Sequence, residues 1–403
     1  MPQGVDYKLK QLPEDFQVEE LTRLIGGADG PFAFYRLEKR GWTTPDALDV
    51  VRRRWKIEPR RIAFGGLKDR HALTVQYLTI FHGPQRGLDQ QGIRVEYLGQ
   101  VSTAYTAHDF DRNRFRLTVR ALAPSARPEL EVDLSHLAVE GVPNYFDDQR
   151  FGSVSGEGGE FIGRLLVRGR FEEALRLALT APYEHDRAAQ KAEKHLLEAN
   201  WGNWKMLRER LPRGPTRSLI DYLQVHPHDF RGTLARLSQE MRMLYLSAYQ
   251  SHLWNRLLAT WLRQHCPADQ LRPVALRLGE VPFHVGLVGD RLRELSALAL
   301  PLMSSRLKLA DDDLHAALVQ TVVAEEGLTL RDLQVRGIRE MFFSKGERQA
   351  LCMPQGLTHN FAADELCSGK EKLLLAFDLP RGSYATLIVK RLFGSGRETS
   401  EFD

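Results

Sequence analysis

The sequence has 403 residues, which suggests two or three domains and enough chain to bury a substantial core. It is 43% hydrophobic and 27% charged, an ordinary composition for a globular protein that argues against a collagenous or disordered chain. No apolar run reaches the roughly 18 residues of a membrane helix, and the first ten residues lack the apolar stretch of a secretory signal. The net charge of +4 alone says little about partners.

The first 155 residues alternate between strand and helix patterns. Thr44-Pro45-Asp46 is a strong helix start, because it offers a hydroxyl cap, a proline at the first helical position and an acid near the positive end of the dipole. Apolar and turn patterns predict strands over residues 15–21, 32–37, 62–67 and 73–81.

Positive charge gathers in this part of the chain. Residues 36–70 hold eleven Lys or Arg against five Asp or Glu, a local +6 that exceeds the total for the whole chain. Arginine presents a planar fork that suits phosphate, so the stretch is compatible with nucleic-acid binding. A solvated basic face explains the same composition.

Residues 113–121 form the clearest strand pattern. Phe115, Leu117, Val119 and Ala121 take one face, and the other face carries Arg114, Arg116, Thr118 and Arg120. The polar face could lie against a phosphate backbone or could face solvent in an antiparallel sheet.

From about residue 156 the pattern becomes helical, which points to a domain inserted within another. We expect helices over 171–179, 186–199 and 233–265, the last with an apolar stripe of core residues. That stripe comprises Leu234, Leu237, Met241, Leu244 and Ala248. Strand character returns over 371–377 and 384–389, on either side of the turn Pro380-Arg381-Gly382.

Common cofactor and metal motifs are missing from the sequence. The three cysteines show no CxxC spacing, and the histidines have no HExxH partner spacing, so we expect no disulfide framework and no metal site. Residues 152–163 are glycine-rich but lack the GK[ST] of a phosphate loop. We therefore expect a reduced, cytoplasmic protein.

Two stretches are harder to explain as plain scaffold. Residues 65–76 (GGLKDRHALTVQ) place Asp69 between Lys68 and Arg70, and neighbouring cations keep a carboxylate ionised, as a nucleophile or base requires. A surface turn with a salt bridge is the alternative. Residues 141–152 (GVPNYFDDQRFG) gather an amide, three aromatic rings and an arginine, which suits an unstacked base or ordinary core packing.

Together these stretches resemble the TruD family of tRNA pseudouridine synthases. The matching segments follow the order of the family's motifs along nearly the whole chain: 10–20 (KQLPEDFQVEE), 66–76, 144–152 (NYFDDQRFG), 247–255 (SAYQSHLWN) and 379–387 (LPRGSYATL). The chain departs from the family pattern at Arg112 and Asp147, where glycine is usual. An acid beside the aromatic ring should disfavour close approach of phosphate.

The resemblance implies an α+β fold that is V-shaped overall. One arm would be the pseudouridine synthase catalytic domain, with a mixed, largely antiparallel sheet, built from residues 1–154 and 336–403. The other would be a mainly helical inserted TRUD domain, residues 155–335. The RNA would lie in the basic cleft between them.

The resemblance also implies roles for individual residues. Asp69 would be the essential carboxylate, Lys10 the cation that stabilises it, and Asn144 the amide that orients it. Phe146 would stack on the target base, while Lys68, Arg70 and Gln76 would shape the loop or touch phosphate. Further substrate-binding candidates are Arg150, Arg114 and Arg116.

The implied activity is the isomerisation of a tRNA uridine, usually uridine 13, to pseudouridine. This reaction needs no cofactor and no metal. The implied partner is tRNA, and we expect a monomer that does not associate with a membrane. Three alternatives stay open: a non-catalytic RNA-binding or chaperone protein on this scaffold, a synthase acting on another RNA, and a hydrolase that removes the base.

Overall fold

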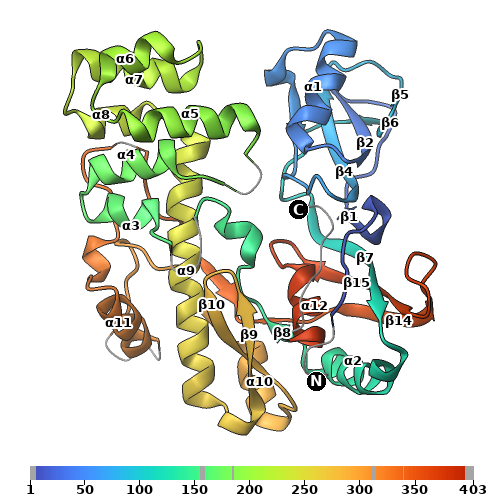
Figure 1. The fold of residues 1–403 in the computed structure, drawn as a ribbon. Helices are drawn as coiled ribbons and strands as arrows, with labels where there is room; N and C mark the ends of the chain where they lie inside the picture. The colour runs from blue at the N-terminus through green and yellow to red at the C-terminus, as the bar shows by residue number, and fades with distance from the viewer. Residues whose placement is uncertain (1–5, 155–158, 184–185, 311–314, 339, 395–403) are drawn as a thin grey trace. The chain divides into compact units, whose positions relative to one another are not determined.

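The computed structural model describes residues 6–154, 159–183, 186–310, 315–338 and 340–394. The chain divides into two compact units, one made of Met1–Val142 with Cys352–Asp403 and one of Pro143–Leu351 (Figure 1). The second is thus inserted into the first. The domain limits expected at 155 and 335 stay a prediction, and residue 155 lies outside the described residues.

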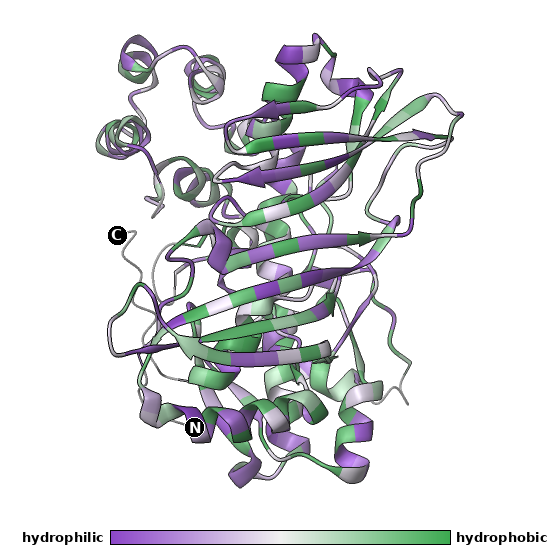
Figure 2. Cartoon of the chain, turned by 90° about the vertical axis from the view of Figure 1, so that its right-hand side faces the viewer, coloured by the Kyte–Doolittle hydropathy of each residue, from purple (hydrophilic) through white to green (hydrophobic). Residues whose placement is uncertain are grey.

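The first unit is built on a nine-stranded sheet in the order β14-β15-β7-β1-β4-β2-β6-β5, with β3 paired to β4. Only β1 and β4 run parallel within it, and the other pairs are antiparallel. Hydrophilic and hydrophobic residues alternate along the strands, as Figure 2 shows. The strands are β1 (Phe16–Thr22), β2 (Phe32–Arg40), β3 (Ile62–Phe64), β4 (Leu73–Phe81), β5 (Leu88–Gln90), β6 (Ile93–Val101), β7 (Phe110–Leu122), β14 (Gln355–Ala363) and β15 (Glu371–Pro380).

The described residues of this unit also form the α-helices α1 (Thr44–Trp55), α2 (Arg127–Glu140) and α12 (Ala385–Phe393). Ala47, Leu48 and Val51 of α1 pack on inward side chains of β2, β4 and β6. The cap of α1 is Thr43, whose hydroxyl accepts the Asp46 N–H at 3.2 Å, and not Thr44 as expected. The hydroxyl of Thr44 is instead used by the loop that carries Asp69, as described below.

One arginine of the arginine-rich strand is buried, whereas the sequence predicted an exposed polar face. Arg120 is buried in β7, where its guanidinium pairs with Asp15 at 2.8 Å and Asp364 at 2.9 Å. These carboxylates cover the guanidinium, so Arg120 is buried on the polar face of the strand; the φ of 64° at the next residue, Ala121, interrupts the alternation only beyond it. The prediction from strict period-2 alternation therefore fails at the end of this strand.

The segment expected to be a strand over 384–389 is the first part of helix α12. Its β-branched residues suit a strand by local preference. Ala385, Leu387 and Ile388 are nevertheless buried as helix residues, because tertiary packing outweighs a preference of under one kcal/mol per residue. The turn at 380–382 is present, so only the element after it was wrong.

The second unit is mainly helical, with short strands. Its helices are α3 (Ile162–Val167), α4 (Phe171–Thr180), α5 (Ala188–Ala199), α6 (Trp204–Arg210), α7 (Pro215–Val225), α8 (Phe230–Ala235), α9 (Gln239–His265), α10 (Gly289–Ala297) and α11 (Ala316–Glu325). Its strands pair as β9 (Leu271–Leu276) with β10 (Gly279–His284), and β11 (Ala299–Pro301) with β12 (Glu347–Gln349). The short strands β8 (Val142–Pro143) and β13 (Leu351–Cys352) lie where the chain passes between the units.

The long helix expected over 233–265 is two helices. Ser238 caps α9 by accepting the Met241 N–H, so the helical repeat does not run through from α8. Consequently Met241 and Leu244 of the predicted core stripe are exposed, 37% and 40%, while Tyr245 and Tyr249 are buried. No helix among the described residues is long and apolar enough to cross a membrane.

Candidate functional site

Asp69 lies in the loop that joins the antiparallel strands β3 and β4 of the first unit. Gly65 begins this loop at a point of close packing, since a Cβ there would lie 2.6 Å from the Phe110 ring. The parallel pairing of β1 with β4 sets Gln17 opposite Leu73, which brings the start of β1 to the end of the loop. We call Lys10, Lys39, Lys68, Asp69 and Gln76 the Asp69 cluster.

Lys10 and Asp69 form an ion pair. Lys10 Nζ lies 2.5 Å from Asp69 Oδ2, and the His71 N–H donates to Oδ1 at 3.0 Å. The side chains are only 20% and 23% exposed. Burial raises the pKa of the Asp69 carboxyl, but the Lys10 charge and the two hydrogen bonds outweigh it and hold that pKa below its ordinary value. Asp69 is therefore ionised at neutral pH.

The ammonium of Lys10 is itself held in place. It lies 4.4 Å over the centre of the Phe16 ring, a cation–π contact at the first residue of β1. Lys10 also has a φ of 61°, a backbone conformation that is uncommon for a residue with a side chain. Strained backbone of this kind concentrates at functional sites, which agrees with a special role for this residue.

Lys39 of β2 holds the loop that carries Asp69 by hydrogen bonds to backbone carbonyls. It was not singled out from the sequence. The side chain is fully buried, and its Nζ donates to the carbonyls of Asp69 at 2.7 Å, Trp42 at 2.8 Å and Lys68 at 3.4 Å. An ammonium has three donors, so all three are used. Burial lowers the pKa of Lys39 to about 8, with the Asp69 charge acting against that shift.

This buried ammonium makes stability depend on pH. Between pH 8 and 10 the unfolded chain holds a proton that the folded chain loses, so folding becomes more favourable as pH rises. We expect the free energy of unfolding of the unaltered chain, minus that of Lys39→Met, to increase by about 2 kcal/mol between pH 7 and pH 10. Urea unfolding at both pH values measures this difference. Lys370→Met, at an exposed lysine, is the control. If the difference between the unaltered chain and Lys370→Met changed with pH to a similar extent, the assignment to Lys39 would be contradicted.

Lys68 and Gln76 brace the same loop from the side. Lys68 Nζ pairs with Glu20 at 3.0 Å and donates to Asn113 Oδ1 at 2.7 Å. Gln76 is fully buried and donates to the Gly66 carbonyl at 3.2 Å. The Thr44 hydroxyl links the two, since it donates to Gln76 at 2.8 Å and accepts the Lys68 N–H at 3.0 Å. These contacts fit the loop-shaping role rather than contact with phosphate.

The remaining arginine candidates of the first unit differ in their availability. Arg70 is exposed, and no acidic partner is found for it among the described residues. Arg114 makes a two-pronged pair with Asp378, at 3.0 and 3.2 Å, and Arg116 lies 4.0 Å from Glu19. Arg70 is thus the better candidate for a phosphate contact.

The second stretch forms a cluster of its own in the inserted unit, which we call the Phe146 cluster. Its centre is Arg348, which follows Glu347 in β12 and was not singled out from the sequence. Arg348 donates to the backbone carbonyl of Asn144 at 2.9 Å and to its side-chain oxygen at 2.8 Å. The Asn144 amide in turn donates to the Gln349 carbonyl at 2.9 Å. Asn144 is therefore fixed in orientation within its own unit.

The Phe146 ring is half-buried among cations and a second ring. The guanidinium of Arg348 lies 4.2 Å from the ring centre and that of Arg150 5.6 Å, and the Trp254 ring meets it edge-on. Asn255 of α9 clamps the Phe146 backbone, accepting its N–H and donating to its carbonyl, both at 2.8 Å. Arg150 also donates to the Ser251 hydroxyl at 3.0 Å.

Asp147, the acid at the position after Phe146 where the family pattern has glycine, is buried. Asp147 is only 1% exposed, so its carboxylate presents little charge to an incoming phosphate. The repulsion expected from the sequence is thereby reduced.

Lys39 and Arg348 were not identified from the sequence, and they differ in how well the sequence could have predicted them. Lys39 shares the inward face of β2 with Tyr35 and Leu37, so period-2 alternation could have predicted its burial. Arg348 stands about 200 residues from Asn144, and no local pattern connects them. Among the described residues, no group of His, Cys, Asp or Glu is arranged to hold a metal ion.

The family model for tRNA pseudouridine synthase D (TruD) matches residues 2–274 and 290–392, nearly the whole chain. The chain belongs to this family. The resemblance found in the motifs is thereby confirmed, and with it the assignment to a family of isomerase enzymes.

Several members show how far the similarity extends. A Methanocaldococcus jannaschii chain named "Probable tRNA pseudouridine synthase D 2" is 31% identical, over 97% of this chain and 92% of its own length. The tRNA pseudouridine synthase D of Aquifex aeolicus is 29% identical, over 97% and 99%. A crystal structure from Methanosarcina mazei under the same family name superposes with a TM-score of 0.70 at 26% identity, over 97% and 94%. The expected α+β class with a mainly antiparallel sheet is confirmed.

Proposed function

We propose that this chain converts uridine to pseudouridine in tRNA, at position 13, with Asp69 as the essential carboxylate. The supporting observation is the half-buried ion pair of Lys10 and Asp69 at 2.5 Å, which keeps the carboxylate charged at neutral pH. Family membership supplies the reaction, and position 13 comes from the family's usual target.

The reaction rearranges one nucleotide. The bond between N1 of uracil and C1′ of ribose breaks, the base turns, and C5 bonds to C1′; the hydrogen on C5 leaves to solvent and N1 gains a proton. The ionised Asp69 either attacks the nucleotide or takes a ribose proton. No electron donor or acceptor enters this balance, so side chains alone can supply the chemistry.

The target base must leave its helix first, which costs a few kcal/mol. Phe146 offers a ring for the extruded base, and stacking on an aromatic ring returns about 1–3 kcal/mol. The exposed Arg70 would contact the phosphate backbone, and Asn144 is the expected orienting amide. A monomeric state and a cytoplasmic location remain predictions.

A tritium-release assay tests the proposal. A tRNA transcript carrying tritium at C5 of uridine releases it to solvent when C5 bonds to C1′, and transcripts with a single labelled position identify the target. We expect release from uridine 13 alone. Release of free uracil would indicate a hydrolase, release only from another RNA would change the substrate, and tight binding without release would leave a non-catalytic RNA-binding protein.

Arg348 offers a test of the Phe146 cluster. Lysine keeps the charge but cannot donate to both Asn144 oxygens while stacking on Phe146. We expect Arg348→Lys to lower kcat on the order of 100-fold, because a catalytic group is misplaced, and to change KM by less than about threefold. Single-turnover and steady-state assays separate the two constants.

The control for Arg348 is Arg293→Lys, at an exposed arginine of the same unit. It should behave like the unaltered chain. If Arg348→Lys kept its kcat, the shared anchoring of Asn144 and Phe146 would be unimportant for turnover.

A further inference from the structure

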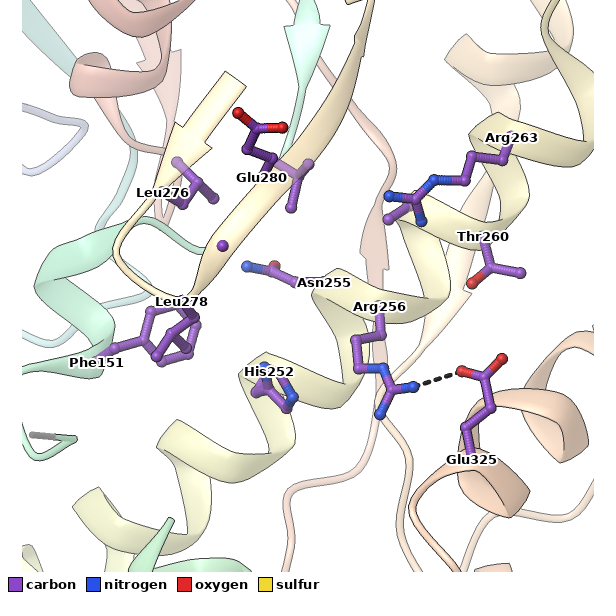
Figure 3. Close-up of a pocket in the computed structure, with 13 residues that line it drawn as sticks. Phe151, His252, Asn255, Arg256, Thr260, Arg263, Leu276, Leu278, Glu280 and Glu325 are labelled. Carbon is purple, nitrogen blue, oxygen red and sulfur yellow. Dashed lines mark hydrogen bonds and ion pairs between the residues drawn. The ribbon is translucent and has the colours of Figure 1, made fainter. Parts of the chain in front are cut away.

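A second feature of the inserted unit is not used by the reaction above. A cavity of about 450 Å³ lies between helix α9 and the hairpin of β9 and β10 (Figure 3). This volume falls within the range of small-ligand pockets and can hold a nucleotide. All the residues that line it belong to the inserted unit.

The two walls of this cavity differ in character. His252, Arg256, Thr260 and Arg263 recur every three or four residues, so they form one stripe along α9. The opposite wall is apolar, formed by Leu276, Leu278 and Val281 of the hairpin together with Phe151, although Glu280 stands at its edge. A flat ring with a polar edge fits such a pair of walls.

The charges on the helical wall are unequally matched. Arg256 pairs with Glu325 and with the buried Glu326, so its charge is balanced. Arg263 is exposed, and no acidic partner is found for it in the described parts of the chain. One unbalanced guanidinium suits a single phosphodiester.

His252 supplies a neutral hydrogen-bonding group. Burial lowers the pKa of His252 to about 4, with the Glu326 charge acting against that shift, so the ring is neutral at pH 7. Its Nε2 lies 3.9 Å from Glu326, too far for a hydrogen bond, and its ring packs on Phe161. A neutral imidazole has one donor and one acceptor, which can read the edge of a base.

The cavity is also connected to the Phe146 cluster. Asn255 lines it while both ends of its amide hold the Phe146 backbone. The Arg277 N–H at the hairpin turn donates to Asp148 at 2.8 Å, which ties the hairpin to the segment after Phe146. A ligand here would therefore rest against the residues that fix Phe146.

We propose that this cavity binds a second unpaired nucleotide of the RNA substrate, with its base between the hairpin and α9 and its phosphate on Arg263. The inference rests on the proposed function for the identity of the RNA. It extends recognition beyond the target uridine to a site built partly from the motif residues Phe151, His252 and Asn255 and partly from the hairpin of β9 and β10.

Direct contact is tested by crosslinking. Leu278→p-benzoylphenylalanine, in the full chain, should crosslink to a tRNA transcript at one nucleotide other than the target when irradiated. The same probe at Val225, which is 71% exposed on α7, is the control. Equal crosslinking from both positions, or none from position 278, would overturn the proposal.

Affinity gives a second, independent readout. We expect Leu278→Trp, which fills the cavity, and Arg263→Glu each to weaken tRNA binding about tenfold, and Arg263→Glu to reduce the salt dependence by about one phosphate contact. Val225→Trp should bind normally. Saturation of the cavity by adenosine or uridine 5′-monophosphate, without a tRNA crosslink, would assign it to free nucleotides and refute the RNA assignment.

Binding is measured in the Asp69→Asn background, so the result does not depend on turnover. If the tritium assay failed but these variants still weakened tRNA binding, the cavity would stand and the isomerase proposal would fall. If tritium were released normally and these variants bound tRNA as well as the unaltered chain, only the cavity proposal would be lost.

Discussion

Asp69→Asn should reduce pseudouridine formation at least about 10⁴-fold and leave the affinity for tRNA within a few-fold. Asparagine has nearly the same shape and its oxygen can still accept the His71 N–H, now 3.0 Å away. It has no negative charge, so it can neither attack the nucleotide nor accept a proton, and its pairing with Lys10 is lost. Tritium release measures turnover, and filter binding measures affinity.

Asp29→Asn is a matched control, because Asp29 is an exposed aspartate in the loop between β1 and β2. Its activity should equal that of the unaltered chain. Turnover by Asp69→Asn at the normal rate would remove the carboxylate from the mechanism, whereas a loss of tRNA binding would point to a folding or docking defect.

Lys10→Met should both slow the reaction and make it sensitive to acid. In the unaltered chain the pKa of Asp69 is lowered, so the carboxylate stays ionised as pH falls toward 5. Without the Lys10 charge, burial acts unopposed by its main counter-charge and the pKa rises. We expect kcat/KM of Lys10→Met to be about 100-fold below that of the unaltered chain at pH 7. As pH is lowered from 8 to 5, we expect kcat/KM of the variant to fall by about a further tenfold.

The pH–rate profile of kcat/KM distinguishes this effect from simple misfolding. Lys10→Arg keeps the positive charge and should keep the profile of the unaltered chain, with a smaller loss of rate. Lys8→Met removes a cation from the same segment and should change neither. A flat profile for Lys10→Met would mean that Lys10 does not control the ionisation of Asp69.

Much of the fold followed from local patterns. The alternation over residues 15–21 and the apolar pattern over 73–81 mark real strands, and Pro45 lies in the first turn of a real helix. The errors occur where a distant contact decides. Arg120 is buried because Asp15 and Asp364 balance its charge, and residues 384–389 are helical because of packing. A window of neighbouring residues contains neither fact.

The site was predictable to a different extent in each unit. Asp69 and Lys10 were identified from motifs, and the structure pairs them, although their roles stay predictions. Lys39 and Arg348 hold the motif residues through backbone carbonyls and an amide. Such anchors depend on which strands become neighbours, which the sequence alone does not give.

The counter-ion of Asp69 comes from a segment that precedes the first strand of the sheet. Two backbone hydrogen bonds tie Lys8 to Arg120, at 3.0 and 2.8 Å, and Tyr7 stacks on Phe393 of the last helix at 4.5 Å. A protease that cut after Lys10 would spare the strands yet leave the ammonium held by these non-covalent contacts alone. Integrity of the amino-terminal peptide is therefore a condition for keeping the carboxylate charged, and it deserves checking by mass whenever a preparation loses activity without unfolding.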